Sequence, residues 1–472
     1  MIDLIDAGYC YLSWNIGWVT LVKRMSWGQL LSPAPFPPYR NFDLHQGGFL
    51  YLSLVSPACE QRRQAMENPA DTECEVASLP GIIEQPYGLY PGLDAFSSDY
   101  TADDYREWVS QSNGDPLPAP LSVYVQDNLF RESRLHSAAA IQHELLMQGH
   151  LIDSDRPMQQ LFFSGSMLTA YSDDQLYQLI ENVRDAFTVD SESLTDWCAS
   201  SGETLLLPAR LRLLKVLGFN GVRFTCQNGV CPHSNLKELI ATVRAARSVG
   251  FQTVTVDLPE DIQYQADPAG SLETLLQEAS RVRLMAEAGV ERVRIIDTLY
   301  NCGFQPLSAG WYVHADDRWL RARAEGRLFW SLLGFSEMPS PDIIGIGPGA
   351  ISAVGDCYSA NSSIRSYYQA SISQGKLPMV SGLELEADDS LRREIMGMIL
   401  AAGVIRISHI EGRWGIGFEQ FFAAESRQLR ELEGRGWVNW QGEDVVICTQ
   451  DHHELSALCR LFDRRVRAAE PG

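Results

Sequence analysis

The sequence predicts an α/β protein built around a parallel β-sheet, and two observations carry that prediction. From about Pro120 onward, short apolar runs alternate with longer segments whose apolar residues recur at helical spacing. Three of the longer segments end on a glycine followed by an apolar residue, at Gly218, Gly250 and Gly289. Glycine is the usual residue just past a helix, and the apolar residue after it is expected to start a buried strand. Repeated strand–helix units imply a parallel sheet, either open or closed into a barrel.

The individual elements follow in order along the chain. Strands are predicted at 121–125, 161–163, 222–225, 253–258 and 293–296, and helices at 205–217 and 272–288. A further helix is predicted after Ser172, because this serine can cap its first turn and Gln175 stands at the capping-box position. Two helices show single apolar faces, formed by Leu176, Leu179, Ile180 and Val183 and by Leu236, Leu239, Ile240 and Val243. Ligands of such folds bind at the carboxyl ends of the strands.

The two ends of the chain differ from this central part, residues 86–365. Residues 1–85 are rich in Trp, Pro and Gly without clear periodicity, and we interpret them as an irregular N-terminal extension. Residues 366–472 predict helices at 390–402 and 418–433, a hairpin of 437–439 with 445–448, and a last helix capped by Asp451 and Glu454 in a capping box. This order resembles a winged-helix module. We favour a packing role over DNA binding because the protein is acidic.

Charge and hydropathy argue against several classes of function. The chain of 472 residues has 38 Lys and Arg against 60 Asp and Glu, which gives a net charge of −22. Binding to nucleic acid or to an anionic membrane requires clustered positive charge, so neither partner is expected. No apolar run reaches the roughly 18–20 residues that span a bilayer. The apolar-rich stretch at 8–22 follows acidic rather than basic residues, unlike a secretory signal. We therefore expect a cytoplasmic protein with reduced cysteines.

Several segments resemble one family of enzymes. The strongest is Gly345-Ile346-Gly347-Pro348-Gly349-Ala350-Ile351-Ser352, followed by Gly355-Asp356-Cys357-Tyr358 and Asn361 and continued by 389–393. Weaker ones are the first predicted strand with Pro120, the segment that begins at Tyr90-Pro91, and the strand and turn at 160–169. Together they resemble the oxygen-independent coproporphyrinogen III oxidases of the radical S-adenosylmethionine superfamily, over roughly residues 86–470.

The resemblance implies a fold, a reaction and a binding site. The fold is an incomplete parallel β/α barrel, similar to a TIM barrel, with a C-terminal helical, winged-helix-like domain. The reaction is the oxidative decarboxylation of two propionate side chains of coproporphyrinogen III, a step of haem biosynthesis. The family uses a 4Fe–4S cluster and S-adenosylmethionine, and the cofactor performs the difficult step. The positions that match the family's ligand-binding residues are Tyr124, Gly165, Asp196, Gln227, Asp257 and Ile351.

The chain departs from the family where the cluster is held. The family has three cysteines just after the first strand, because soft thiolates stabilise iron–sulfur clusters. The matching positions here are Phe130, Arg134 and Ser137, and none of them supplies a thiolate. A rival alignment recovers only Cys59, and it lies far from the turn at Ser164, so we reject it. That turn is also changed, because side chains at 164–168 stand where the family brings bare backbone to the ligand.

Other clusters of reactive residues have simpler interpretations. Cys226, Cys231 and His233 fit no standard zinc spacing, and Cys448, His452, His453 and Cys459 are expected at a strand and on a buried helix face. The acidic pairs at 173–174 and 316–317 need no catalytic role, since the first lies in the opening turn of a helix. We therefore predict no metal site.

Three hypotheses of function remain open from the sequence. The first is a pseudoenzyme without a cluster, which binds a tetrapyrrole or S-adenosylmethionine, or partners a protein of the same pathway. The second is a working enzyme. It is either a coproporphyrinogen III dehydrogenase or related radical enzyme with a cluster held by other cysteines, or a fold reused for non-radical chemistry. The third is a winged-helix interaction protein. The remaining ligand-binding positions can equally serve only to hold the strand ends together.

Overall fold

The computed structural model describes residues 43–45, 49–51, 87–127, 134–165, 167–189, 196–201, 206–224, 236–258, 268–284, 289–339 and 341–465. The chain divides into two compact units, Met1–Glu73 and Cys74–Gly472. In the first unit, β1 (Asp43–His45) and β2 (Phe49–Tyr51) pair antiparallel. All further elements belong to the second unit. No helix in the described part of the chain is long and apolar enough to cross a membrane.

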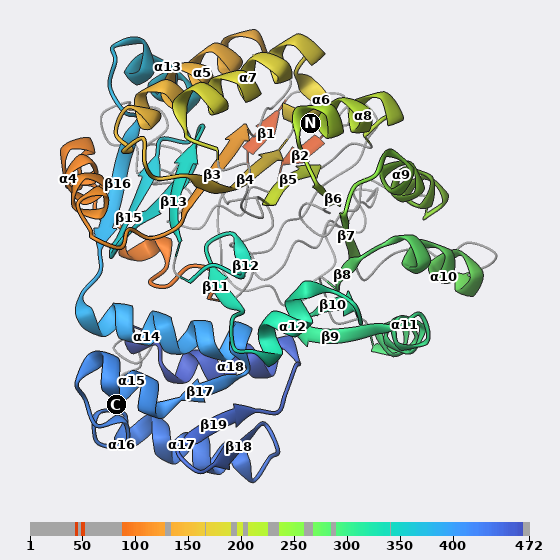
Figure 1. Ribbon diagram of the computed structural model, residues 1–472, viewed down its shortest axis with the longest axis vertical. Coiled ribbons are helices and arrows are strands. Elements are labelled where there is room, and N and C mark those ends of the chain that lie inside the picture. Colours follow the sequence, from red (N-terminus) through yellow and green to blue (C-terminus); the bar gives the residue numbers. More distant parts are fainter. Residues whose placement is uncertain are drawn as a thin grey trace. The chain divides into compact units, whose positions relative to one another are not determined.

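A curved sheet of 12 strands forms the centre of the second unit (Figure 1). Its middle is parallel, in the order β13 (Asp342–Ile346), β3 (Leu121–Asp127), β4 (Met158–Gly165), β5 (Asp196–Ser201), β6 (Gly221–Phe224), β7 (Thr253–Leu258) and β8 (Arg281–Leu284). Antiparallel strands extend both sides, β14 (Ile351–Val354), β15 (Cys357–Asn361) and β16 (Met379–Glu384) beside β13, and β10 (Trp311–His314) and β9 (Phe304–Ser308) beside β8. Because β16 and β9 are not paired with each other, the barrel is incomplete, as the sequence predicts.

Helices cover the outer face of the sheet (Figure 1). They are α4 (Ala102–Asn113), α5 (Arg134–Gly149), α6 (Met167–Ala170), α7 (Asp173–Ala186), α8 (Pro208–Leu217), α9 (Leu236–Val249), α10 (Pro268–Glu278), α11 (Gly289–Asn301) and α13 (Arg365–Ser373), with one short turn at Leu93–Ala95. The predicted capping box of Ser172 and Gln175 is present at the start of α7, and the predicted apolar face of α7 is buried. Alternate strand residues such as Val222, Val254 and Val282 pack against these helices, so the intervening residues face the barrel interior.

The glycine pattern is confirmed at two of the three predicted helix ends. Gly218 and Gly250 follow α8 and α9 with φ of +110° and +97°, and each leads into the next parallel strand. The prediction at Gly289 is wrong, because this glycine begins α11. The predicted helix at 272–288 ends at Glu278 and strand β8 follows it, whereas the predicted strand at 293–296 is helical. The apolar runs in this stretch are too short for periodicity to separate a buried strand from a helix.

The C-terminal part contributes most residues of a second buried apolar cluster, which also includes Tyr90 and Ala309. It consists of α14 (Ala387–Gly397), the π-helix η2 (Met398–Ala402), β17 (Val404–Arg406), α15 (Ile407–Trp414), α16 (Phe418–Phe421), α17 (Ala423–Glu433), β18 (Val438–Gln441), β19 (Asp444–Ile447) and α18 (His452–Leu461). The helix predicted at 390–402 is thus an α-helix that continues as a π-helix. Asp451 caps α18. Glu454 is linked to the backbone N–H of Asp451 through Thr449. The Thr449 hydroxyl donates to the Glu454 carboxylate and accepts from the Asp451 N–H.

A small hairpin lies between the barrel and the C-terminal part (Figure 1). It consists of β11 (Phe329–Ser331) and β12 (Gly334–Ser336), and it follows α12 (Arg318–Ala324). The Phe335 ring packs edge-on against Trp330 and Trp311, with ring centroids 4.9 and 6.0 Å apart. The hairpin therefore covers one end of the barrel with an aromatic cluster.

The segment with the strongest family resemblance has a structural task. Gly347 has a φ of +110°, and a β-carbon on it would lie 1.9 Å from the carbonyl oxygen of Gln126 on β3. The buried carboxylate of Glu144 on α5 accepts hydrogen bonds from the Gly347 N–H at 2.8 Å, the Asn361 amide at 2.6 Å and the Tyr368 hydroxyl at 2.5 Å. Burial raises the pKa of Glu144 to about 7, although these hydrogen bonds act in the opposite direction. The signature thus joins β13 to β3 and α5.

We expect Gly347→Ala to destabilise the protein far more than Gly375→Ala. Both glycines have positive φ, +110° and +70°, but no atom lies within 4 Å of the β-carbon position of Gly375. The control should cost about 1–2 kcal/mol from backbone strain alone. Gly347→Ala adds a clash with the backbone of β3, so it should cost about 3 kcal/mol or more. Urea unfolding of both variants measures the difference, and equal losses would show that the close approach to Gln126 is unimportant.

Candidate functional site in the barrel interior

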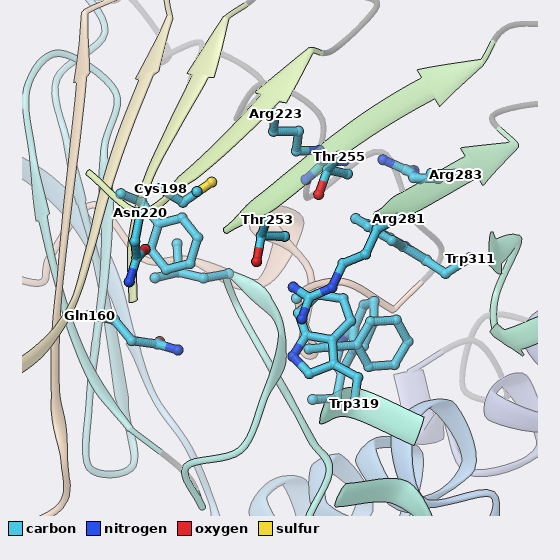
Figure 2. Close-up of a pocket in the computed structure, with 16 residues that line it drawn as sticks. Gln160, Cys198, Asn220, Arg223, Thr253, Thr255, Arg281, Arg283, Trp311 and Trp319 are labelled. Atoms are coloured by element: carbon cyan, nitrogen blue, oxygen red, sulfur yellow. The ribbon is translucent and has the colours of Figure 1, made fainter. Parts of the chain in front are cut away.

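A cavity of about 70 Å³ lies inside the barrel, in the amino-terminal half of the parallel strands (Figure 2). Its walls are inward-facing residues of β4 to β8, and the β11–β12 hairpin and Trp319 bound it from the side of the C-terminal part. The lining is polar and aromatic: Gln160, Phe162, Cys198, Asn220, Gly221, Arg223, Thr253, Thr255, Arg281, Arg283, Trp311, Trp319, Trp330, Leu333, Gly334 and Phe335. Sequence reasoning placed the site at the carboxyl ends of the strands and missed this cavity. Alternating polar residues on the short strands β6 to β8 were the available signal.

Three guanidinium groups face this cavity, and aromatic rings support two of them (Figure 2). The Arg281 guanidinium stacks 3.4 Å from the centroid of the Trp319 ring and forms an ion pair with Asp317 at 2.7 Å. Asp317 also accepts from the backbone N–H of Trp319 as the cap of α12, so one carboxylate holds the cation and anchors the first turn of the helix that carries the ring. Cation–π contacts of this kind are worth up to about 2 kcal/mol when desolvated.

The second guanidinium, that of Arg223, forms an ion pair with Asp257, which was expected to bind a ligand. Arg223 on β6 donates three hydrogen bonds to Asp257 on β7, with the closest approach 3.0 Å, and it lies 4.9 Å from the centroid of the Trp311 ring. The side chain of Asp257 is fully buried and that of Arg223 is 13% exposed. The carboxylate is therefore already matched by a cation of the same chain.

Three of the expected ligand-binding positions lie on adjoining strands. Tyr124 on β3 pairs in register with Phe162 on β4, and Gly165 ends β4 opposite Asp127. Tyr124 and Ile351 belong to one buried apolar cluster. The Tyr124 hydroxyl donates to Gln126, whose amide donates to the Pro348 carbonyl oxygen at 2.9 Å. Tyr124 therefore supports the seam between β3 and β13 through Gln126, and the role of all three positions in ligand binding remains a prediction.

Of the other expected positions, Asp196 does not join this group. Asp196 was predicted at the end of a strand, but it begins β5 and pairs in register with Gln160, three residues into β4. Parallel strands run in the same direction, so the backbone of Asp196 lies toward the amino edge and Gly165 at the carboxyl edge. The prediction placed this strand too early in the sequence, since β5 ends at Ser201. Gln227 lies outside the described residues.

The residues at the cluster positions do not fit an iron–sulfur cluster. Phe130 lies outside the described residues, and Arg134 and Ser137 begin α5. Just before this loop, the buried carboxylate of Asp127 accepts from the Tyr171 hydroxyl at 2.6 Å and pairs with Arg365 at 3.1 Å. The described cysteines are free thiols on separate elements: Cys198, Cys302, Cys357, Cys448 and Cys459. The described ranges contain no group of three metal-ligating side chains.

The remaining candidates from the sequence have structural roles or are not described. Cys226, Cys231, His233 and Cys59 lie outside the described residues. Cys448 is exposed just after β19, whereas Cys459 is buried in α18, where burial raises the pKa of its thiol. The acidic pair at 173–174 lies in the first turn of α7, and Asp317 caps α12.

Comparison with known proteins agrees with the resemblance seen in the sequence. Oxygen-independent coproporphyrinogen III oxidase of Pseudomonas aeruginosa is 23% identical over 394 residues, which are 73% of this chain and 86% of the relative. The enzyme of the same name from Escherichia coli is 22% identical over 431 residues, 81% of this chain and 93% of the relative. This chain is a homologue of the oxygen-independent coproporphyrinogen III oxidases. No protein-family model matches it.

The fold agrees with a solved structure of this family. Coproporphyrinogen III oxidase from Escherichia coli, described as a radical S-adenosylmethionine enzyme, superposes with a TM-score of 0.70 at 20% identity. The match covers 80% of this chain and 96% of the solved chain. The oxidase-type barrel and the C-terminal part are therefore both retained, although four of five residues have changed.

We expect Arg223→Met to destabilise the protein strongly, because it leaves the buried carboxylate of Asp257 without its cation. Breaking one side of a buried pair typically costs about 3–5 kcal/mol. The double variant Arg223→Met with Asp257→Leu should recover most of this loss, since it removes both charges. Denaturant unfolding of the two single variants and the double variant measures the coupling. Additive losses would show that the ion pair does not connect β6 to β7.

Proposed function

We propose that this protein is a pseudoenzyme of the coproporphyrinogen III oxidase family that has lost cluster-dependent radical chemistry and acts by binding. The observation that carries the proposal is the residue set Phe130, Arg134 and Ser137 at the three cysteine positions. A phenyl ring has no donor atom, and a guanidinium is a permanent cation that repels iron. The arginine also stands at the start of a helix, where a positive charge is unfavourable and an anionic cluster would otherwise be stabilised.

The barrel interior supports the same proposal. A radical enzyme of this family needs polar side chains that are available to its cofactor, whereas Asp257 here is engaged by Arg223 and Asp127 by Arg365. Neither ion pair can be opened without leaving a buried charge unpaired. The interior is therefore organised for stability around its own charges.

We further propose that the ligand is a tetrapyrrole carboxylate and that the protein works in the cytoplasm, alone or with a protein of the same pathway. The relatives are named for coproporphyrinogen, whose propionate groups are carboxylates. Three guanidinium groups, those of Arg223, Arg281 and Arg283, face the cavity, and guanidinium–carboxylate pairing is strong there. Arg223 and Arg281 keep their ion pairs with Asp257 and Asp317, so a ligand carboxylate would add to these pairs and not replace them. The cavity is smaller than the roughly 300–1,000 Å³ of sites that enclose a ligand. The macrocycle must therefore lie outside it.

The alternative is a working oxidase whose cluster is held by cysteines outside the described residues, such as Cys226 and Cys231. Anaerobic reconstitution with iron and sulfide separates the two. We expect the native chain to retain far less than the four irons per chain of a full cluster and to leave S-adenosylmethionine uncleaved. The matched control is the triple variant Phe130→Cys, Arg134→Cys, Ser137→Cys, which should bind more iron. Stoichiometric four-iron loading of the native chain with reductive cleavage would establish an active radical enzyme.

Titration with coproporphyrin III tests the ligand. We expect saturable binding, seen as a shift of the porphyrin absorbance band, with an affinity at least about tenfold above that of its tetramethyl ester, which lacks the charged groups. Equal binding of acid and ester would indicate non-specific apolar adsorption. If neither compound binds saturably, the proposal of tetrapyrrole binding is wrong. The pseudoenzyme assignment is then decided by the iron measurement alone.

A further inference from the structure

A second and larger cleft lies between the barrel and the C-terminal part. Its volume is about 470 Å³, which falls within the roughly 300–1,000 Å³ of small-molecule sites. One wall comes from the hairpin and from Pro341, Ile343 and Tyr358 of the barrel, and the other from α14, η2, β17 and α15. Pro341 and Ile343 stand at the start of β13, so the cleft lies at the opposite edge of the sheet from the family's cofactor loop.

The wall of the cleft includes the π-helix. Met398 and Ala402, the first and last residues of η2, both line it. A π-helix places an extra residue in a turn at a cost in stability, and such segments occur mostly at functional sites. Within η2, Ile399 and Leu400 are buried in the C-terminal core, so the segment packs into that core and meets the cleft at its two ends.

The charged side chains of the cleft are paired with one exception. Arg393 pairs with Asp356 at 2.8 Å. Glu394 accepts from His409 at 3.0 Å, Trp414 at 2.9 Å and Arg413 at 3.2 Å. Among the described residues, no hydrogen bond or ion pair involves the guanidinium of Arg406, which lies against the backbone of Gly326. The cleft therefore presents one cation whose donors remain available to an acceptor.

The rest of the lining is aromatic and apolar. Trp330, Trp414, Tyr358 and Phe329 contribute rings, with Leu328, Leu332 and Met398 between them. The indole nitrogen of Trp330 is buried and donates to no acceptor in the described structure. A buried donor without an acceptor is costly to the folded state.

We propose that this cleft binds a small, flat aromatic molecule that carries one acidic group. The rings and aliphatic side chains accommodate its body, and the Arg406 guanidinium pairs with its carboxylate or sulfonate. Trp330 also lines the barrel cavity, so an occupant of the cleft contacts the hairpin that closes the barrel. The site does not depend on the proposed function, because it lies on the side away from the cluster loop.

Fluorescence titration with anilinonaphthalene sulfonate tests the proposal, since this probe is an aromatic body with one sulfonate. Phenylnaphthylamine, which has the same body without the charge, is the matched ligand. We expect one saturable site per chain for the sulfonate, with an affinity at least about tenfold above that of the neutral analogue. Equal affinities would overturn the proposal, because the cleft would then offer only apolar surface.

Variants locate the site. Arg406→Gln should lower the affinity for the sulfonate by about tenfold or more and leave the affinity for the neutral analogue unchanged. Arg406→Lys, which keeps the positive charge, should lower the affinity for the sulfonate less. The control is Arg427→Gln, an exposed arginine that bonds only to its own helix at Ala423 and does not line the cleft. Unchanged unfolding midpoints show that each variant is folded. Equal binding by native protein and Arg406→Gln would overturn the proposal, as would a concentration-dependent dimer that excludes the probe, since the cleft would then be an interface between copies.

Discussion

The pairing of β13 with β3 is the constraint on which the rest of the structure depends. These strands lie more than 200 residues apart in the sequence, and their five paired positions bring the last parallel strand beside the first. Buried carboxylates hold the seam. Asp342 forms an ion pair with Arg156 at 2.8 Å, with both side chains only 3% exposed, and Glu144 accepts three hydrogen bonds. Because a buried carboxylate without partners is very costly, these residues strongly favour one arrangement of the strands.

The seam explains why the fold is retained at low sequence identity. The segment around Gly347 resembles the family most strongly, and its contacts are to backbone and to buried acids rather than to an open site. Such packing tolerates little change, since a single β-carbon meets the neighbouring strand. The cluster positions Phe130, Arg134 and Ser137 belong to a different part of the chain. Substitutions there can remove a cofactor and leave the barrel intact, which agrees with a TM-score of 0.70 at 20% identity.

The barrel cavity and the cleft beside the C-terminal part differ in whether their charged side chains form ion pairs within the protein. Inside the barrel, Arg223 and Arg281 are matched by Asp257 and Asp317, and both cations also stack on tryptophan rings. Such an interior is stable without a ligand. The cleft beside the C-terminal part combines apolar walls with the exposed guanidinium of Arg406, which forms no hydrogen bond or ion pair with the described residues and is available to a molecule that enters. The hairpin at Trp330 separates the two regions and contacts both.

The sequence by itself determined the strand–helix repeat, because apolar periodicity and helix-capping residues are local signals. Ser172 and Gln175 form their capping box, Gly218 and Gly250 end their helices, and the hairpin around Gly442 forms as predicted. The same signals failed at Gly289, where short apolar runs suit a helix or a strand equally well. The sequence also showed that Phe130, Arg134 and Ser137 supply no thiolate, since that conclusion needs only residue identity.

Only the tertiary structure decided which of these side chains meet. The Arg223–Asp257 pair joins two strands, and the shift of Asp196 to the start of β5 removes it from the expected group. The cleft depends on residues from Gly326 to Trp414 that share no local pattern. Contacts between distant segments depend on strand order and packing, and a single sequence carries no local signal for either. Residue identity therefore specifies what each side chain can do, and the fold specifies what it does.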